Sequence, residues 1–139
     1  MSRSAQDSVV NTRYKALNQT RGTVLCDSLQ PAETLTAKTR GLTGHDQLAP
    51  GTGMLFSSSA ALPIMWMHMF FMRFAIDIVF LDRDGKVLKI DADLKPWRVS
   101  SIVIGARNAL ELPAGSAKSS GTQVGDQVAL RPLLPVDAL

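Results

Sequence analysis

Residues 65–82 form an apolar stretch that carries ionisable side chains in its interior. The stretch reads MWMHMFFMRFAIDIVFLD, and its main polar residues are His68, Arg73, Asp77 and Asp82. Its length would suit a membrane helix, but an arginine or aspartate inside such a helix costs about 3 kcal/mol. The aromatic and β-branched residues predict instead two buried strands that lead into a hairpin.

Short apolar runs between turn residues account for most of the remaining chain. We expect strands at residues 14–17, 23–26, 54–56, 86–91, 99–104, 108–112 and 127–130. Asp84-Gly85 supplies the positive φ values of a tight hairpin turn. One short helix is expected within residues 31–44, because Pro31 suits a first helical turn and Gly41 or Gly44 suits its C-terminal end.

This pattern predicts an all-β, mainly antiparallel fold. The expected architecture is a jelly-roll-like β-sandwich or a flattened barrel with one short helix near residues 31–44. A doubly wound α/β sheet would need helices between its strands, and the sequence does not offer them.

The chain of 139 residues has the length of one domain. We expect a mobile N-terminal tail at residues 1–11, a single domain at residues 12–131 and a C-terminal tail at residues 132–139. Because the first twenty residues contain no apolar segment of signal-peptide length, the sequence as given favours the cytoplasm, or export if it is a processed form. No transmembrane segment is expected.

Composition argues against several classes of function. The net charge is +3, and the basic residues form no cluster, so nucleic-acid binding is not expected. Cys26 is the only cysteine, which excludes an internal disulfide and a multi-cysteine metal site. The sequence lacks the usual nucleotide-binding and serine-hydrolase motifs, and no cofactor is expected. The sequence does not indicate an oligomeric state.

Five motifs occur in an order typical of one family. They are RGLTG at residues 40–44, GMLF at 53–56, FMRFAIDIVFLD at 71–82, ARNALELPAG at 106–115 and GD at 125–126. Over about residues 14–130 the chain resembles the bacterial and archaeal family named domain of unknown function 192. The resemblance implies a compact jelly-roll-like β-sandwich. It implies no activity, because the function of the family is not established.

The chain departs from the family pattern at two positions. Ala75 stands where family members usually carry proline, and Thr43 stands where they often carry a bulky residue. The family proline implies a corner between two strands near Phe74-Ala75, which alanine permits without enforcing.

Ionisable side chains inside apolar strands need partners. We expect Glu111 to pair with Arg73, and Arg40 or Arg107 to pair with Asp77. These five residues either form buried ion pairs that fix the strand register or form the floor of a ligand pocket. In the second case Arg73 would hold an anionic or hydroxyl-rich ligand through its planar guanidinium group.

The segment from Met65 to Met69 raises the possibility of a copper site. Thioether and imidazole groups, here Met67, His68 and Met69, suit Cu(I). However, a strand directs Met65, Met67 and Met69 to one side and His68 to the other, so one ion cannot engage them together. His45 is expected in a solvated loop, and neither histidine has a second histidine at zinc spacing.

The absence of catalytic motifs favours a non-enzymatic module that binds a small anionic or carbohydrate-like ligand, or an accessory role. The alternative is a carbohydrate-active or other hydrolase that uses Asp77 and Glu111 as paired carboxylates. A third possibility, a purely structural interaction protein, would show an exposed apolar patch and no pocket.

Overall fold

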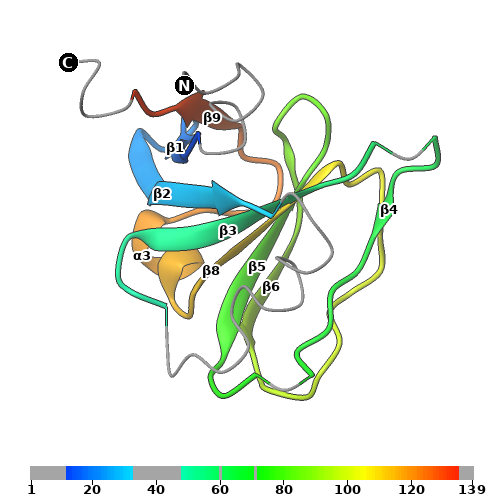
Figure 1. The fold of residues 1–139 in the computed structure, drawn as a ribbon. Coiled ribbons are helices and arrows are strands. Elements are labelled where there is room, and N and C mark those ends of the chain that lie inside the picture. Colours follow the sequence, from blue (N-terminus) through cyan, green and yellow to red (C-terminus); the bar gives the residue numbers. More distant parts are fainter. Residues whose placement is uncertain (1–11, 33–47, 60, 71, 135–139) are drawn as a thin grey trace, which may run out of the picture.

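The structure, a computed structural model, describes residues 12–32, 48–59, 61–70 and 72–134. Figure 1 shows the arrangement of its elements. The described elements in chain order are β1 (Tyr14–Asn18), β2 (Thr23–Pro31), β3 (Thr52–Ser57), β4 (Ile64–Met65), β5 (Ile76–Leu81), β6 (Val87–Leu94), β7 (Val103–Ile104), β8 (Asn108–Pro113), α3 (Ser116–Ser120) and β9 (Val128–Pro132).

The fold is mainly antiparallel β structure, as the sequence predicts. Seven strands form one sheet in the order β6-β5-β8-β3-β2-β1-β9, and β4 pairs with β7 in a separate two-stranded ribbon. β2 and β3 are parallel, and the other paired strands are antiparallel. The large sheet curls into a half-barrel (Figure 1), so of the two expected shapes the flattened barrel describes it better.

The curl brings the two edges of the large sheet together at the β5–β6 hairpin. The N–H of Val128 donates to the carbonyl of Gly85, and the N–H of Val87 donates to the carbonyl of Asp126. Gly85 has φ of 89°, the left-handed backbone that Asp84-Gly85 was expected to supply. The predicted hairpin is therefore confirmed, and its tip also closes the curl.

Two apolar clusters cover the two faces of the sheet. β5 is buried along its whole length, and its side chains alternate between the clusters. The arm core contains Ile76, Ile78 and Phe80 together with Met54, Met65, Met69, Met72 and Val103. The barrel core lies on the other face and contains Val79 and Leu81 together with Leu25, Leu29, Leu110, Leu112 and Val128.

The ribbon that covers the arm core is here called the arm, and it comprises residues 61–70 and 97–105. A bend at residues 73–74 separates the arm from β5, which confirms the corner expected near Phe74-Ala75. The expected strand at 99–104 is shorter, because only Val103–Ile104 pair regularly. The Ser100 hydroxyl accepts the N–H of Met67 at 2.7 Å, in a place where a regular ladder would use a backbone carbonyl.

The described helix is not the one expected from the sequence. The helix expected at residues 31–44 falls almost entirely outside the described residues, and Pro31 ends β2. The described helix is α3, a five-residue turn between Gly115 and Gly121, where the sequence pattern predicted no helix. In the part of the chain that is described, no helix is long and apolar enough to span a membrane.

Candidate functional site

Asp77 is buried in β5 and binds two backbone N–H groups. Its Oδ1 accepts from the N–H of Asp93 at 2.9 Å, and its Oδ2 accepts from the N–H of Ala117 at 2.9 Å. The carboxylate therefore ties the end of β6 to the first turn of α3. The expected partner Arg107 instead donates to the carbonyl of Ser58, and Arg40 lies outside the described residues.

Glu111 is buried in β8 among apolar side chains. Its neighbours across the sheet are Met54 in β3 and Ile78 in β5, both in the arm core. Burial raises the pKa of the Glu111 carboxyl from 4.5 to about 8, so the group is mostly protonated at neutral pH. Arg73 lies exposed at the bend before β5, and within the described residues no ion pair joins it to Glu111. The expected pair of Arg73 and Glu111 is therefore not formed.

The two carboxyl groups lie on opposite faces of the sheet. In the β5–β8 register, Asp77 is opposite Leu112 and Ile78 is opposite Glu111. Opposed residues share a face, so Asp77 faces the barrel-core side with Leu112, and Glu111 faces the arm core with Ile78. Asp77 and Glu111 cannot form the floor of one pocket, and paired-carboxylate hydrolysis requires them on the same side.

The Met65–Met69 segment alternates as the sequence predicts. Met65 and Met69 are buried in the arm core, whereas Trp66 and His68 are exposed. The His68 ring stacks on Phe70 with ring centroids 4.8 Å apart. His68 therefore faces away from Met69, and these two side chains cannot meet at one copper ion. His45 lies outside the described residues. Within the described ranges, no group of three His, Cys, Asp or Glu side chains could hold a metal ion.

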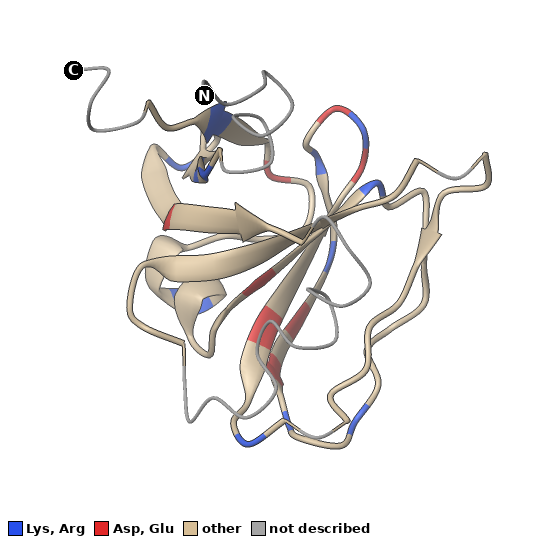
Figure 2. Ribbon diagram, viewed as in Figure 1, with Lys and Arg blue, Asp and Glu red and all other residues tan. Residues whose placement is uncertain are grey.

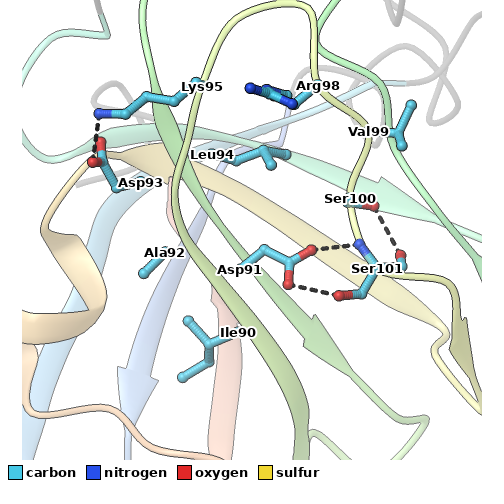
Figure 3. A pocket seen from close by; sticks show the side chains of 10 residues that line it. All are labelled: Ile90, Asp91, Ala92, Asp93, Leu94, Lys95, Arg98, Val99, Ser100 and Ser101. Carbon is cyan, nitrogen blue, oxygen red and sulfur yellow. Dashed lines mark hydrogen bonds and ion pairs between the residues drawn. The ribbon is translucent and has the colours of Figure 1, made fainter.

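A groove with a volume of about 540 Å³ lies between β6 and the start of the second arm segment. Figure 3 shows its lining side chains, which come from residues 90–95 and 98–101. The polar ones are Asp91, Asp93, Lys95, Arg98, Ser100 and Ser101, and the larger apolar ones are Ile90, Leu94 and Val99.

Hydrogen bonds hold the polar side chains of the groove in place. Asp91 accepts from the N–H of Ser101 at 2.6 Å and from the Ser101 hydroxyl at 2.8 Å, which ties β6 to the arm. The Lys95 ammonium lies 2.6 Å from the Asp93 carboxylate. Asp93 has a left-handed φ of 52°, and its backbone N–H donates to the buried Asp77 carboxylate. Asp77 therefore holds the backbone of a groove residue in place from the interior of the protein.

Sequence reasoning did not select the groove residues. The alternation at residues 86–91 indicated a half-exposed strand that ends at Asp91, and Asp93 lies just beyond it. The pattern could not show which segment faces that strand. The contact depends on the fold of residues 95–101, where the backbone leaves regular structure.

The fold defines a class: a single curled, mostly antiparallel sheet with a two-stranded arm over one face. The model of the family named domain of unknown function 192, described as an uncharacterized ACR, matches residues 16–130. The chain belongs to this family.

Two archaeal relatives carry uncharacterised-family names. The UPF0127 protein of Thermococcus sibiricus is 29% identical over 112 residues, which cover 81% of this chain and 71% of the relative. The UPF0127 protein PH1112 of Pyrococcus horikoshii is 38% identical over 61 residues, which cover 44% of this chain and 52% of the relative. Neither name states an activity.

Two solved structures share the fold. A protein from Sinorhizobium meliloti, described as a proposed transcription regulator, superposes with a TM-score of 0.71 at 24% identity, covering 86% of this chain and 92% of that one. A protein of unknown function from Novosphingobium aromaticivorans gives a TM-score of 0.69 at 22% identity, covering 84% of this chain and 83% of that one. At these identities the likeness concerns the fold alone.

Proposed function

We propose that the protein is a non-enzymatic module that binds a carbohydrate-like ligand in the groove between β6 and residues 98–101. The observation that carries this proposal is the lining of the groove. Two carboxylates, two cationic groups and two hydroxyl groups line a volume of about 540 Å³ together with the apolar side chains of Ile90, Leu94 and Val99. Ligand sites commonly combine an apolar surface with a few fixed polar groups in this way.

The charge balance of the groove favours a hydroxyl-rich ligand over a simple anion. Asp91 and Asp93 would repel an anion, which offsets the attraction of Lys95 and Arg98. A sugar hydroxyl can donate to a carboxylate and accept from a cation, so it uses both kinds of group. Leu94 and Val99 supply apolar surface for the C–H faces of a sugar ring.

Arg98 is the residue in the groove best suited to anchor such a ligand. It is exposed in the groove, and its planar guanidinium group offers several donors in a fixed geometry. Asp91 is already held by Ser101, and Lys95 is held by Asp93, so these groups provide an ordered frame around it. Anionic sugars and simple anions are comparison ligands for the test.

The hydrolase alternative receives no support from the fold. Asp77 and Glu111 lie on opposite faces of the sheet, and Asp77 is occupied by two backbone N–H groups. A non-enzymatic role therefore fits the described residues better than paired-carboxylate chemistry.

A screen by NMR chemical-shift perturbation tests the proposal. The isotope-labelled protein is titrated with neutral monosaccharides and oligosaccharides, uronic acids, phosphate and sulfate. We expect neutral sugars to shift the amide signals of residues 90–101, and we expect Arg98→Ala and Asp91→Asn to weaken this binding. Arg131→Ala is the matched control, because Arg131 is exposed on β9 and does not line the groove.

Two outcomes would contradict the proposal. One is a screen in which no sugar perturbs these signals. The other is a bound sugar whose affinity is unchanged in both Arg98→Ala and Asp91→Asn. In the first case, a response to phosphate and sulfate would identify the groove as an anion site.

A further inference from the structure

The arm presents an apolar face to solvent. Along its first segment, Ile64, Trp66, His68 and Phe70 alternate with the inward-facing methionines. Along its second segment, Ile104 is the direct partner of Ile64, and Val99 is the partner of His68. We call this surface the outer face of the arm, and its members are Ile64, Trp66, His68, Phe70, Trp97, Val99, Ile102 and Ile104.

The exposure of this face is high for side chains of its kind. Ile102 and Ile104 are 72% and 74% exposed, and Trp97 and Trp66 are 59% and 53% exposed. Neighbouring aromatic rings contact one another along the face, from Trp66 through His68 and Phe70 to Trp97. Contiguous exposed apolar surface of this kind marks an interaction site in a soluble protein.

The backbone fixes the outward position of Trp97. This residue has φ of 67°, a left-handed conformation that is unfavourable for a bulky side chain. Its N–H donates to the carbonyl of Met69, and the N–H of Met69 donates to the carbonyl of Arg98, each at 2.7 Å. These bonds hold the turn against its strain, so the face is formed before any partner arrives.

Basic residues outnumber acidic residues around this face. Residues 61–76 and 94–110, which include the arm, contain four basic residues, Arg73, Lys95, Arg98 and Arg107, and no acidic residue. The remaining eleven basic and twelve acidic residues of the chain nearly balance. Figure 2 shows basic positions at the bends where the arm meets the large sheet. Two acidic groups lie nearby, and both have partners: Asp93 pairs with Lys95, and Asp91 accepts hydrogen bonds from Ser101. The surface thus combines aromatic and aliphatic side chains with an excess of positive charge.

We infer that the outer face of the arm docks on the surface of an anionic lipid bilayer. Tryptophan and phenylalanine side chains insert favourably at the level of the lipid headgroups. Basic side chains near the surface are attracted to anionic headgroups, and the attraction weakens with salt. A protein partner of this chemistry would need acidic groups around an apolar centre, and a second copy of this face would instead repeat its positive charge.

The two tryptophans of the chain make a direct test possible. Trp66 and Trp97 both lie on the outer face, so tryptophan fluorescence, excited selectively over that of Tyr14, reports on this surface. The protein is mixed with vesicles of phosphatidylcholine, or of phosphatidylcholine and phosphatidylglycerol in equal proportion. We expect a blue shift of the emission and co-sedimentation with the anionic vesicles only, and we expect both to diminish as salt is added.

Variants on the outer face localise the contact. Burial of one large aliphatic side chain in the bilayer surface contributes favourable binding free energy. We therefore expect Ile102→Ser and Ile104→Ser each to lower vesicle partitioning on the order of tenfold. Val124→Ser is the matched control, because Val124 is 60% exposed in the loop before β9 and lies outside the arm. These variants leave the groove residues unchanged, so loss of vesicle binding and loss of sugar binding are separate results.

Three results would overturn the inference. The first is the absence of binding to anionic vesicles. The second is equal binding by the wild type, Ile102→Ser and Ile104→Ser. The third is concentration-dependent self-association that these two variants abolish while vesicles have no effect, which would assign the face to a second copy of the chain.

Discussion

The carboxylate of Asp77 accepts the backbone N–H of Asp93 at 2.9 Å, where the β5–β6 pairing is irregular and Asp93 has a left-handed φ of 52°. The same carboxylate accepts the N–H of Ala117 in α3. One buried side chain thus fixes the backbone at two points that are far apart in the sequence.

We expect Asp77→Asn to lower the free energy of unfolding by about 2 kcal/mol, because the amide places a donor against one of two buried N–H groups. Urea denaturation of the variant and the wild type measures the difference. Asp27→Asn is the control, since Asp27 is exposed on β2 and should change stability little. An Asp77→Asn variant as stable as the control would contradict the role assigned to Asp77.

Glu111 should make the protein less stable as the pH rises. Its folded-state pKa is about 8, above the ordinary 4.5, so the folded state holds the proton more tightly than the unfolded state. The stability associated with this proton is present below about pH 4.5 and is lost as the pH rises through about 8. Over this whole pH range, the free energy of unfolding falls by an amount on the order of several kcal/mol.

Substitution of Glu111 by glutamine should remove this dependence. We expect Glu111→Gln to be close to the wild type at pH 5 and more stable than the wild type at pH 9. Denaturant melts at both pH values compare them. If the two proteins lose stability in parallel between pH 5 and pH 9, the burial of Glu111 does not govern this behaviour.

Asp126 should have the opposite effect at low pH. Hydrogen bonds from Arg21 and Asn18, followed by the N–H of Gln123, lower the pKa of Asp126 from 3.8 to about 2. Its contribution to stability is present above about pH 3.8 and is lost as the pH falls towards about 2. Acid unfolding followed by circular dichroism should therefore be less steep over this range in Asp126→Asn than in the wild type. An identical acid transition in the variant and the wild type would show that the hydrogen bonds of Asp126 do not contribute to stability in acid.

The strained backbone at Trp97 predicts a difference between two substitutions. Trp97→Ala and Trp97→Gly both remove the ring, but only glycine adopts φ of 67° without steric cost. We expect Trp97→Gly to be more stable than Trp97→Ala by about 1 kcal/mol. Thermal melts of the pair measure this difference, and alanine at least as stable as glycine would argue against backbone strain at this position.

Features that depend only on residues close together in the sequence could be predicted from the sequence. The Asp84-Gly85 turn and the common side of the methionines at 65 and 69 each follow from a short pattern, whereas the bend near Phe74-Ala75 was expected from the family resemblance. The relation of Asp77 to Glu111 depends on the β5–β8 register. A shift of one residue there would reverse the face of one strand relative to the other.

The helix α3 illustrates a second limit of sequence reasoning. Ser116-Ala117-Lys118-Ser119-Ser120 has weak helix propensity, and its only clear local signal is Gly121 at the C-terminal end. A tertiary hydrogen bond holds the turn, in which the N–H of Ala117 donates to the Asp77 carboxylate. Similarly, the groove arises because residues 95–101 fold against β6 through Asp91 and Ser101. Contacts between distant segments decide both features.

The pairing of β1 with β9 has a consequence for synthesis on the ribosome. Tyr14 pairs with Pro132 and Asn18 pairs with Val128, so β1 meets one of its two neighbours only after more than a hundred further residues have been translated. The β1–β2 hairpin therefore emerges early with one edge unsatisfied, and an open strand edge invites pairing with other chains. Nascent chains of this protein are expected to depend on shielding of that edge until β9 leaves the exit tunnel.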